Sequence, residues 1–441
     1  MLFSPRPYQQ VAIDRMVSLP YQLLALRMGA GKTPITLTAI AELLFNRFEV
    51  SKVIVVAPKR VAELVWHTEA AKWQHTKGLR VQRVLGTAKE RLAALATDAD
   101  IYVINRENLM WLVALVEGSK QDWPFDCVVI DETIGFKDRS SKAWKAIKSV
   151  RDQIKRLYLL TGTPDPQGDL LAMWPQISLM DKGARLGPGV GKYRDRWYQP
   201  DKRNGSVIYS YKLRDGAREE IYTAVADAML SVESDIVLPE RIDNVVQVAF
   251  DMTRYDQLAD EFVSGEVTAV NAAVLAGKLA QVANGAVYAD DGRVEWIHDS
   301  KLDALTEIVE QGEPVLCFTT YVHDQDRIMA RFPNAIKFDG EKSMLKWRKG
   351  EVALMLMHPR SGGHGVDGLQ LSGRVAVWFG LPFDLDLYQQ ASARLHRTGQ
   401  TQEVVIHHLV AVGTIDERIM RVLSTKGDMQ QELLDAMKGL K

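Results

Sequence analysis

The sequence has little of what marks disulfide-bonded, metal-binding or membrane proteins. Two cysteines occur among 441 residues, Cys127 and Cys317, and each lies in an apolar run. This placement indicates small buried side chains and disfavours a disulfide or a metal site. No uninterrupted apolar run approaches the ~20 residues that span a bilayer, and Met1–Arg6 lacks the basic start and apolar stretch of a secretion signal. We therefore expect a cytoplasmic protein without a membrane partner.

The sequence also lacks an excess of charge of either sign, because its net charge is −1 at pH 7. Any contact with a polyanion therefore has to be local. One local excess exists: Lys182–Arg214 holds nine lysines and arginines against two aspartates. Aromatic residues are interleaved there, namely Tyr193, Trp197, Tyr198 and Tyr211. Two interpretations remain open, a nucleic-acid contact with stacking aromatics and a solvated, glycine-rich surface loop.

Short apolar, β-branched runs alternate with longer helical patterns along the chain. Nine such runs predict strands, at Gln22–Leu26, Lys52–Ala57, Asp100–Ile104, Asp126–Asp131, Lys155–Leu160, Pro314–Thr319, Val352–Met357, Arg374–Phe379 and Val404–Val410. Continuous apolar runs between helices are typical of a parallel sheet covered on both faces. The predicted fold class is therefore α/β, with mainly parallel sheets covered by helices.

The predicted strands fall into two sets that lie about 150 residues apart, which predicts two tandem lobes. The boundary is expected near Ser234–Val245, where Val237–Arg241 interrupts a helical pattern. We expect a first lobe over residues 1–235, with a helical and basic extension at about 175–235. The second lobe would span residues 236–441, with a helical segment at about 246–300.

A glycine-containing turn separates the first predicted strand from a helix expected from about Pro34. Its sequence is Met28-Gly29-Ala30-Gly31-Lys32-Thr33. Glycines let the backbone wrap phosphate oxygens with its N–H groups, and a helix N-terminus adds favourable partial charge. Lys32 would neutralise the β- and γ-phosphates, and the Thr33 hydroxyl would ligate Mg²⁺. The turn therefore predicts a nucleoside triphosphate site.

Two further strand ends carry groups suited to the same chemistry. The run Val128–Ile130 ends in two carboxylates, Asp131 and Glu132. At the carboxyl edge of a sheet, Asp131 would hold Mg²⁺ and Glu132 would orient and deprotonate the attacking water. Acidic pairs also end strands as surface turns, but the phosphate loop upstream favours catalysis. Leu159–Pro164 places two threonines around a glycine, which would report on the γ-phosphate; alone, it is a good turn.

The segment Gln390–Arg397 contains two arginines three residues apart, Arg394 and Arg397. In a helix they share a face and would present two guanidinium groups to one phosphate. Arginines supplied in this way are worth roughly 10³–10⁵ in hydrolysis rate. The alternative is a basic, solvated helix face. A triphosphate site completed from a second lobe closes only when the lobes approach, so hydrolysis would produce movement.

In order and spacing these motifs resemble superfamily-two helicase-like ATPases, and among them the Swi/Snf-type DNA translocases. Arg6–Gln9 resembles the adenine-reading Q motif. Ala57–Lys59, followed by Trp66, Glu69, Lys72 and Trp73, resembles motif Ia, and Ile104–Leu109 lies where motif Ib is expected. Later matches are Val315–Phe318 (motif IV), Ser361–Asp367 (motif V), Gln390–Gln400 (motif VI) and Thr414–Ile419 (the helix start that follows).

The resemblance implies two RecA-like lobes and a compact phage or bacterial protein. Its ATP contacts would be Arg6, Gln9, Met28, Gly29, Ala30, Gly31, Lys32 and Thr33, joined by Gly365, Asp367 and Gln390. Thr33 and Asp131 would bind Mg²⁺. The catalytic residues would be Lys32, Asp131, Glu132, Arg394 and Arg397. The implied partner is nucleic acid, with duplex DNA favoured, and the implied state is a monomer.

Some positions depart from the family pattern. Leu26-Arg27 replaces an acidic pair, and motif V continues as Asp367-Gly368. After Asp131-Glu132, Thr133-Ile134 lacks the histidine or aspartate that the family often has there. We expect an ATP-dependent motor that translocates on duplex DNA. The alternatives are a strand-separating helicase on DNA or RNA and a nucleotide-gated clamp on DNA or protein with little turnover.

Trp66 and Trp73 are expected to pack their helix on its sheet, and His407 and His408 are expected to point to opposite faces of their strand.

Overall fold

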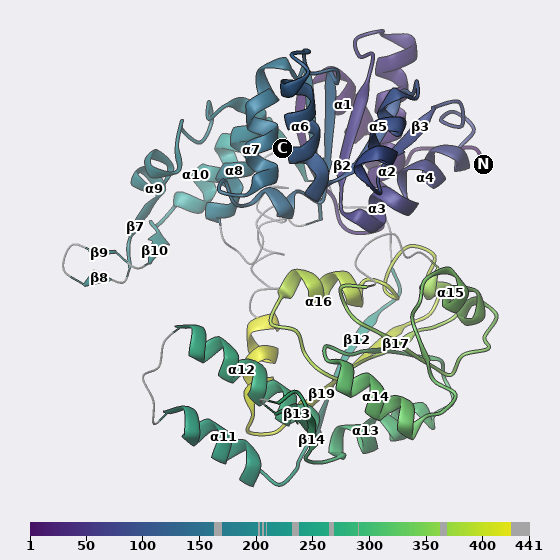
Figure 1. Ribbon diagram of the computed structural model, residues 1–441, viewed down its shortest axis with the longest axis vertical. Coiled ribbons are helices and arrows are strands. Elements are labelled where there is room, and N and C mark those ends of the chain that lie inside the picture. The colour runs from purple at the N-terminus through teal and green to yellow at the C-terminus, as the bar shows by residue number, and fades with distance from the viewer. Residues whose placement is uncertain are drawn as a thin grey trace. The chain divides into compact units, whose positions relative to one another are not determined.

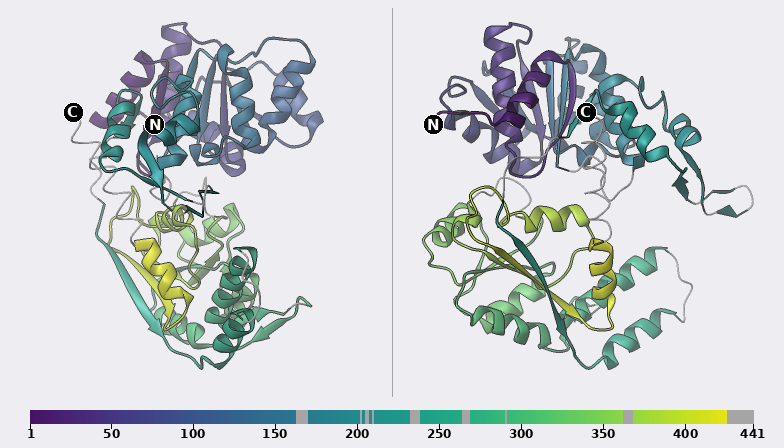
Figure 2. Two further views of the ribbon diagram at one scale, coloured as in Figure 1. Left: turned by 90° about the vertical axis from the view of Figure 1, so that its left-hand side faces the viewer. Right: turned by 180° about the vertical axis from the view of Figure 1, so that it is seen from behind.

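The structure is a computed structural model that describes residues 1–162, 170–201, 203–204, 207–208, 210–231, 238–263, 269–289, 291–361 and 368–424. The chain divides into two compact units, and it passes from one to the other between Ile236 and Val237. Figures 1 and 2 show that each unit has its own sheet and its own helices. Each unit is described by itself below.

The first unit is built on a parallel sheet of seven strands in the order β11-β1-β6-β5-β2-β4-β3. The strands are β1 (Tyr21–Ala25), β2 (Val53–Ala57), β3 (Val81–Val84), β4 (Ile101–Asn105), β5 (Cys127–Asp131), β6 (Arg156–Thr161) and β11 (Met229–Ser231). Alternate residues of β2 belong to different hydrophobic clusters, Val53 and Val55 to one and Ile54 and Val56 to the other. Since side chains alternate across a strand, both faces of the sheet are buried.

Helices cover the two faces of this sheet (Figure 2). One hydrophobic cluster includes residues of α1 (Pro7–Ser18), α2 (Lys32–Ala41) and α4 (Trp66–Lys72). The other includes residues of α6 (Leu109–Gly118), α7 (Lys142–Val150), α8 (Met173–Asp181), α9 (Val190–Trp197) and α10 (Ala217–Val225). The remaining helices are α3 (Lys59–Leu64) and α5 (Ala88–Ala96), and α2 continues into a π-helical turn at Glu42–Asn46.

The basic segment of the first unit folds into α9 and a β-hairpin that projects from the sheet-bearing body (Figure 1). The hairpin pairs β7 (Tyr198–Pro200) with β10 (Tyr211–Leu213), and β8 (Arg203–Asn204) with β9 (Val207–Ile208).

The aromatic residues of this segment mostly support the fold. Tyr193, Trp197 and Tyr198 are buried in the hydrophobic core, so they are not available to stack on bases. Much of the positive charge is also engaged inside the unit, since Arg185 contacts Asp227 at 2.6 Å and Arg194 lies over the Tyr211 ring.

The second unit has a parallel sheet of six strands in the order β12-β19-β18-β15-β17-β16. The strands are β12 (Arg241–Val248), β15 (Val315–Phe318), β16 (Ile336–Lys337), β17 (Leu354–Met357), β18 (Val375–Trp378) and β19 (Val404–Ala411). Two hydrophobic clusters again lie on opposite faces: one includes residues of α13 (Ser300–Val309) and α14 (Val322–Arg331), the other residues of α15 (Glu341–Arg348) and α16 (Leu385–Ser392).

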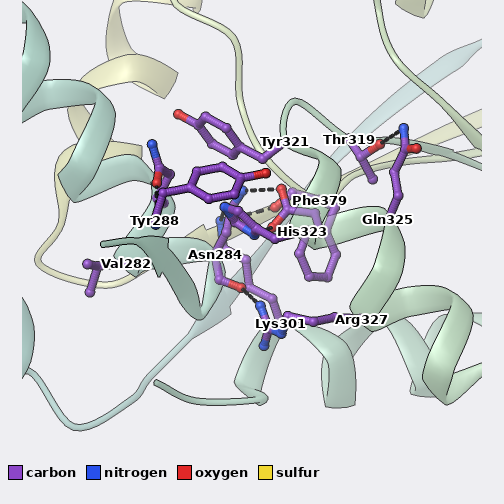
Figure 3. Close-up of polar contacts among 12 residues, drawn as sticks. Val282, Asn284, Tyr288, Lys301, Thr319, Tyr321, His323, Gln325, Arg327 and Phe379 are labelled. Atoms are coloured by element: carbon purple, nitrogen blue, oxygen red, sulfur yellow. Dashed lines mark hydrogen bonds and ion pairs between the residues drawn. The ribbon is translucent and has the colours of Figure 1, made fainter. Parts of the chain in front are cut away.

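A smaller layer precedes α13 in the second unit. It consists of α11 (Thr253–Val263), α12 (Ala269–Asn284) and a hairpin of β13 (Ala286–Tyr288) and β14 (Val294–Trp296), with its own small core. A buried polar network joins this layer to the sheet. Lys301, which is fully buried, donates to Asn284 Oδ1 at 2.8 Å, to the Phe379 carbonyl at 3.1 Å and to Asp416 Oδ2 at 2.6 Å (Figure 3). Because a buried charge needs a partner, these bonds join the end of α12, the residue after β18 and the segment after β19.

The structure confirms the predicted fold class: two α/β lobes, each with a parallel sheet covered by helices. All nine predicted strands are present within one or two residues of their predicted ends. Strands β3, β12, β16 and the short strands between the two sets were not predicted, because they are short or partly polar. Cys127 and Cys317 are both buried and free. Within the described ranges, no helix is long and apolar enough to cross a membrane.

Candidate active site

The phosphate loop joins β1 to α2 and has the backbone that its glycines allow. Gly29 and Gly31 have φ angles of 77° and 82°. Side-chain-bearing residues avoid this left-handed region, so glycine is needed at both positions. Gly31 is the residue before α2, and no described side chain caps this helix. The first turn of α2 thus faces the loop with the backbone N–H groups that bind phosphate oxygens at helix N-termini.

The predicted Q motif lies directly against this loop. Tyr8 donates its hydroxyl to the Ala30 carbonyl at 2.9 Å, and the Gln9 amide donates to the same carbonyl at 3.1 Å. The Gln9 side chain in turn accepts from the Arg6 backbone N–H at 3.0 Å. A Cβ added to Gly31 would lie 2.6 Å from Gln9 Nε2, so the loop and the Q motif are fitted to each other.

Lys32 and Thr33 are the first two residues of α2. The Lys32 ammonium donates to the Leu26 carbonyl at 2.9 Å and approaches the Arg27 carbonyl at 3.4 Å. It therefore folds back over the loop that it is predicted to serve. Thr33 is partly buried at the start of the helix, and Met28 and Gly29 precede it in the loop. These groups fit a triphosphate: a cationic side chain, a hydroxyl and a helix N-terminus converge on one loop.

Sheet order brings the other predicted motifs of the first unit to the same edge. In register, Ala25 of β1 lies opposite Thr161 of β6, and Leu160 of β6 lies opposite Asp131 of β5. The carboxyl ends of these three strands are therefore adjacent, at the edge where open α/β sheets bind ligands. A Cβ added to Gly162, after β6, would meet the Met28 side chain at 3.7 Å, so this turn packs against the phosphate loop. Thr163 and Pro164 lie outside the described residues.

A tryptophan that the sequence reasoning assigned only to packing also contacts the acidic pair. Trp66 is fully buried in the hydrophobic cluster of α1 and α2, as expected, and its indole N–H donates to Asp131 Oδ2 at 3.0 Å. This bond fixes the carboxylate that is predicted to bind Mg²⁺. The signal was available in part, since the motif Ia match included Trp66. Trp73 is half-buried and packs edge-on against Phe3 at 5.2 Å.

Glu132 has φ = 60°, a left-handed conformation that is uncommon outside glycine. Such strain is found at functional sites, where the surrounding structure maintains it. The next residue, Thr133, is fully buried and donates its hydroxyl to Gln176 Oε1 at 2.5 Å. Gln176 lies on α8, so Thr133 connects the acidic pair to this helix.

In the second unit, the predicted arginines do not lie on a helix, and the shared-face argument is wrong. Helix α16 ends at Ser392, and residues from Ala393 onward form successive turns. Within them the Arg394 N–H bonds to the Ala391 carbonyl at 3.0 Å, and the Gln400 N–H to the Arg397 carbonyl at 3.0 Å. Arg394 is 7% exposed, whereas Arg397 is partly exposed. We name residues Ala393–Gln400 the arginine turn.

Two glutamines brace the arginine turn. Gln370 Nε2 donates to the Thr398 carbonyl at 3.1 Å, and Gln400 Nε2 donates to the Gly373 carbonyl at 3.0 Å. Gln390, the other predicted nucleotide contact of this region, is partly exposed on α16. The predicted contacts Gly365 and Asp367 lie outside the described residues. The turn is therefore a fixed structure that orders its arginines without a helix.

Comparisons with known proteins agree with these motifs. The family model described as SNF2-related domain matches residues 8–248, more than half of the chain. A phage protein, p41 of Acyrthosiphon pisum secondary endosymbiont phage 1, is 35% identical, with 99% of each chain covered. An uncharacterized ATP-dependent helicase of Mycoplasma genitalium is 23% identical over 93% of this chain, and this chain spans 40% of that helicase.

A solved structure is also similar. The SWI2/SNF2 ATPase core of Sulfolobus solfataricus, determined in complex with dsDNA, has 21% identity and a TM-score of 0.46, with 98% of this chain and 95% of that chain covered. The family match and the phage relative confirm the resemblance inferred from the motifs. Relatives named ATP-dependent helicases confirm that the family is one of ATP-dependent enzymes. The chain belongs to the SNF2-related domain family.

Proposed function

We propose that this chain hydrolyses ATP and uses it to translocate on duplex DNA. The observation that carries the proposal is the assembly at one sheet edge of the first unit. There the phosphate loop, the strained Asp131-Glu132 pair and the Thr161–Gly162 turn follow three adjacent strands. The family match and the phage relative support an ATP-dependent enzyme.

The proposed roles follow from the side chains. Gly29, Gly31 and the start of α2 bind the phosphates through backbone N–H groups, and Lys32 neutralises the β- and γ-phosphates. On binding, Lys32 exchanges its bond to the Leu26 carbonyl for phosphate oxygens. Glu132 orients the attacking water and takes its proton. Arg6 and Gln9 contact the adenine side of the nucleotide.

The donor set also fits Mg²⁺, a hard cation that prefers oxygen ligands. Thr33 supplies a hydroxyl and Asp131 a carboxylate that the Trp66 N–H holds in one orientation. When bound, Mg²⁺ would neutralise the charge that develops on the phosphates.

We propose further that residues 1–235 and 236–441 act as two lobes of one motor. Arg394 and Arg397, with Gln390, Gly365 and Asp367, would complete the nucleotide site when ATP draws the lobes together. Alternating closure and release would produce stepping along the DNA backbone. Phosphate contacts carry no sequence information, so the motor would be sequence-independent and salt-sensitive.

A panel of nucleic-acid-dependent ATPase assays tests the proposal. Phosphate release is measured with duplex DNA, single-stranded DNA, RNA and no nucleic acid, with Lys32→Ala and Glu132→Gln as inactive controls. We expect duplex DNA to stimulate phosphate release most. In a separate assay, the chain should displace the third strand of a DNA triplex without separating the two strands of the duplex. Stimulation by RNA alone would reject the DNA motor. Strand separation would favour a helicase, and turnover no higher than that of the controls would favour a nucleotide-gated clamp.

A further inference from the structure

The chain that begins the second unit binds directly to the segment that contains the arginine turn. We name the three consecutive residues Pro239–Arg241, which end at the first residue of β12, the junction segment. Each of these residues makes one hydrogen bond to the segment that contains the arginine turn. The Pro239 carbonyl lies 2.8 Å from His396 Nε2, the Glu240 carbonyl accepts from the Val404 N–H at 2.9 Å, and Arg241 Nη2 donates to the Tyr388 hydroxyl at 2.9 Å.

These three partners surround the two arginines in sequence. Tyr388 lies on α16, before the turn, and Val404 begins β19, after it. His396 lies between Arg394 and Arg397. The junction segment therefore holds the arginine turn before, within and after its two cationic side chains. A single bond of this kind is common in any fold, but three from consecutive residues define the position of the whole turn.

The bond through Tyr388 extends into a chain of hydrogen bonds with one direction. Arg241 donates to the Tyr388 hydroxyl, which lies 2.8 Å from His408 Nε2 on β19. Burial raises the pKa of Tyr388, so the hydroxyl keeps its proton. Burial also lowers the pKa of His408 to about 4, so its ring is neutral near pH 7 and Nε2 accepts from the hydroxyl. Each group thus has one role, and the bonds from β12 through α16 to β19 are mutually consistent.

The junction segment is also stiff. Proline fixes its own φ angle, and β12 pairs with β19 in register from Arg241–Val404 to Val248–Ala411. The pairing and the proline therefore fix the junction segment where it contacts the segment that contains the arginine turn.

We propose that the junction segment positions the arginine turn, with His396 and Tyr388 as positioning residues that orient Arg394 and Arg397. The catalytic consequence rests on the proposed ATPase function; the anchoring of the turn does not. His396 must donate from Nε2, because a carbonyl only accepts. Glutamine can present an N–H at a similar distance from the backbone and should replace it in part, whereas alanine cannot.

Hydrogen–deuterium exchange of the full-length chain tests the anchoring without reference to activity. His396→Ala and Tyr388→Phe should each accelerate amide exchange in peptides covering 393–400 by roughly ten-fold, the effect of losing about one hydrogen bond. Peptides covering β15 and β17 should exchange as in the wild type. The matched control is His298→Ala, which removes the same kind of bond, from Nε2 to the Val282 carbonyl at 3.0 Å, elsewhere in the second unit.

Steady-state ATPase kinetics then test the consequence. We expect kcat to fall roughly ten-fold in His396→Ala and Tyr388→Phe, with KM for ATP within two-fold of wild type, since the nucleotide contacts of the first unit are untouched. His396→Gln should recover part of kcat, and His298→Ala should leave it unchanged. Exchange at 393–400 within two-fold of wild type, or equal acceleration in His298→Ala, would overturn the proposal. Faster exchange in a chain whose wild type lacks ATPase activity would support the anchoring and reject the ATPase function.

Discussion

Gly31→Ala provides a sharp test of how the phosphate loop and the Q motif are fitted together. Two effects add at this position. An alanine at φ = 82° incurs the left-handed penalty of roughly 1–2 kcal/mol. Its Cβ would also lie 2.6 Å from Gln9 Nε2. The amide is the end of a flexible side chain, so we expect it to swing away and to lose its bonds to Ala30 and Arg6.

The second effect has a size that the structure allows us to work out. Two hydrogen bonds at roughly 0.5–1.5 kcal/mol each add about 1–3 kcal/mol to the strain. Gly216 supplies the matched control, because it also precedes a helix and has φ = 75°, yet an added Cβ meets nothing within 4 Å. Gly216→Ala should therefore destabilise the first unit by about 1–2 kcal/mol, and Gly31→Ala by about 2–5 kcal/mol. The loss of unfolded-state entropy is common to both variants and cancels.

Guanidinium unfolding of the first unit, followed by tryptophan fluorescence, measures these differences. A double-mutant cycle with Gln9→Ala isolates the contact: since both changes remove the same two bonds, their effects should fall short of additivity by about 1–3 kcal/mol. Binding of a fluorescent ATP analogue should weaken in Gly31→Ala and not in Gly216→Ala. Equal destabilisation by the two glycine variants, or full additivity with Gln9→Ala, would refute the reasoning.

Three further predictions concern other buried contacts. Trp66→Phe removes the donor to Asp131, and we expect the Mg²⁺ concentration for half-maximal ATPase to rise roughly ten- to hundred-fold, as for other residues that orient metal ligands; an unchanged titration would exclude this role. Lys301→Met leaves Asp416 buried and unpaired, so the second unit should lose about 3–5 kcal/mol in guanidinium unfolding, and a loss below about 1 kcal/mol would contradict the buried pair. The third prediction uses the lowered pKa of His408, about 4 against an ordinary 6.5. Between these pH values the unfolded chain binds a proton that the folded ring does not, so stability should fall by up to roughly 3 kcal/mol as the pH drops. His408→Gln should flatten this dependence in thermal unfolding, and an unaltered pH profile would disprove it.

The sequence predicted the sheets well because their strands are buried on both faces. A run such as Val53–Ala57 has to be apolar throughout when helices cover both sides of the sheet, so the strand can be recognised from the sequence alone. Strand β12 was missed for the opposite reason. Most of its residues are exposed at the edge of the sheet, so its sequence alternates irregularly between polar and apolar side chains.

The order of the motifs could also be recognised from the sequence, but the local geometry of the arginine turn could not. Spacing suggested that Arg394 and Arg397 share a helix face, whereas α16 ends at Ser392 and bonds from Gln370 and Gln400 shape the turn that follows. Gln370 lies on another segment, and Gln400 ends the turn but bonds to Gly373 on another segment, so no local sequence pattern predicts these bonds. The sequence also did not decide between a nucleic-acid contact and a solvated loop for the basic segment. Burial of Tyr193 and Trp197 in the core indicates a structural role for these two residues.

The sequence by itself determined the residue types at the candidate site, the order of the motifs and the two-lobe α/β architecture, because phosphate loops and buried strands depend on neighbouring residues. Only the tertiary structure decided how these residues are supported. The bonds from Trp66 to Asp131, from the Pro239 carbonyl to His396 and from Lys301 to Asp416 join residues 65, 157 and 115 positions apart. Side chains this far apart in the sequence come into contact only when packing brings their elements together, so no pattern of neighbouring residues predicts the contact.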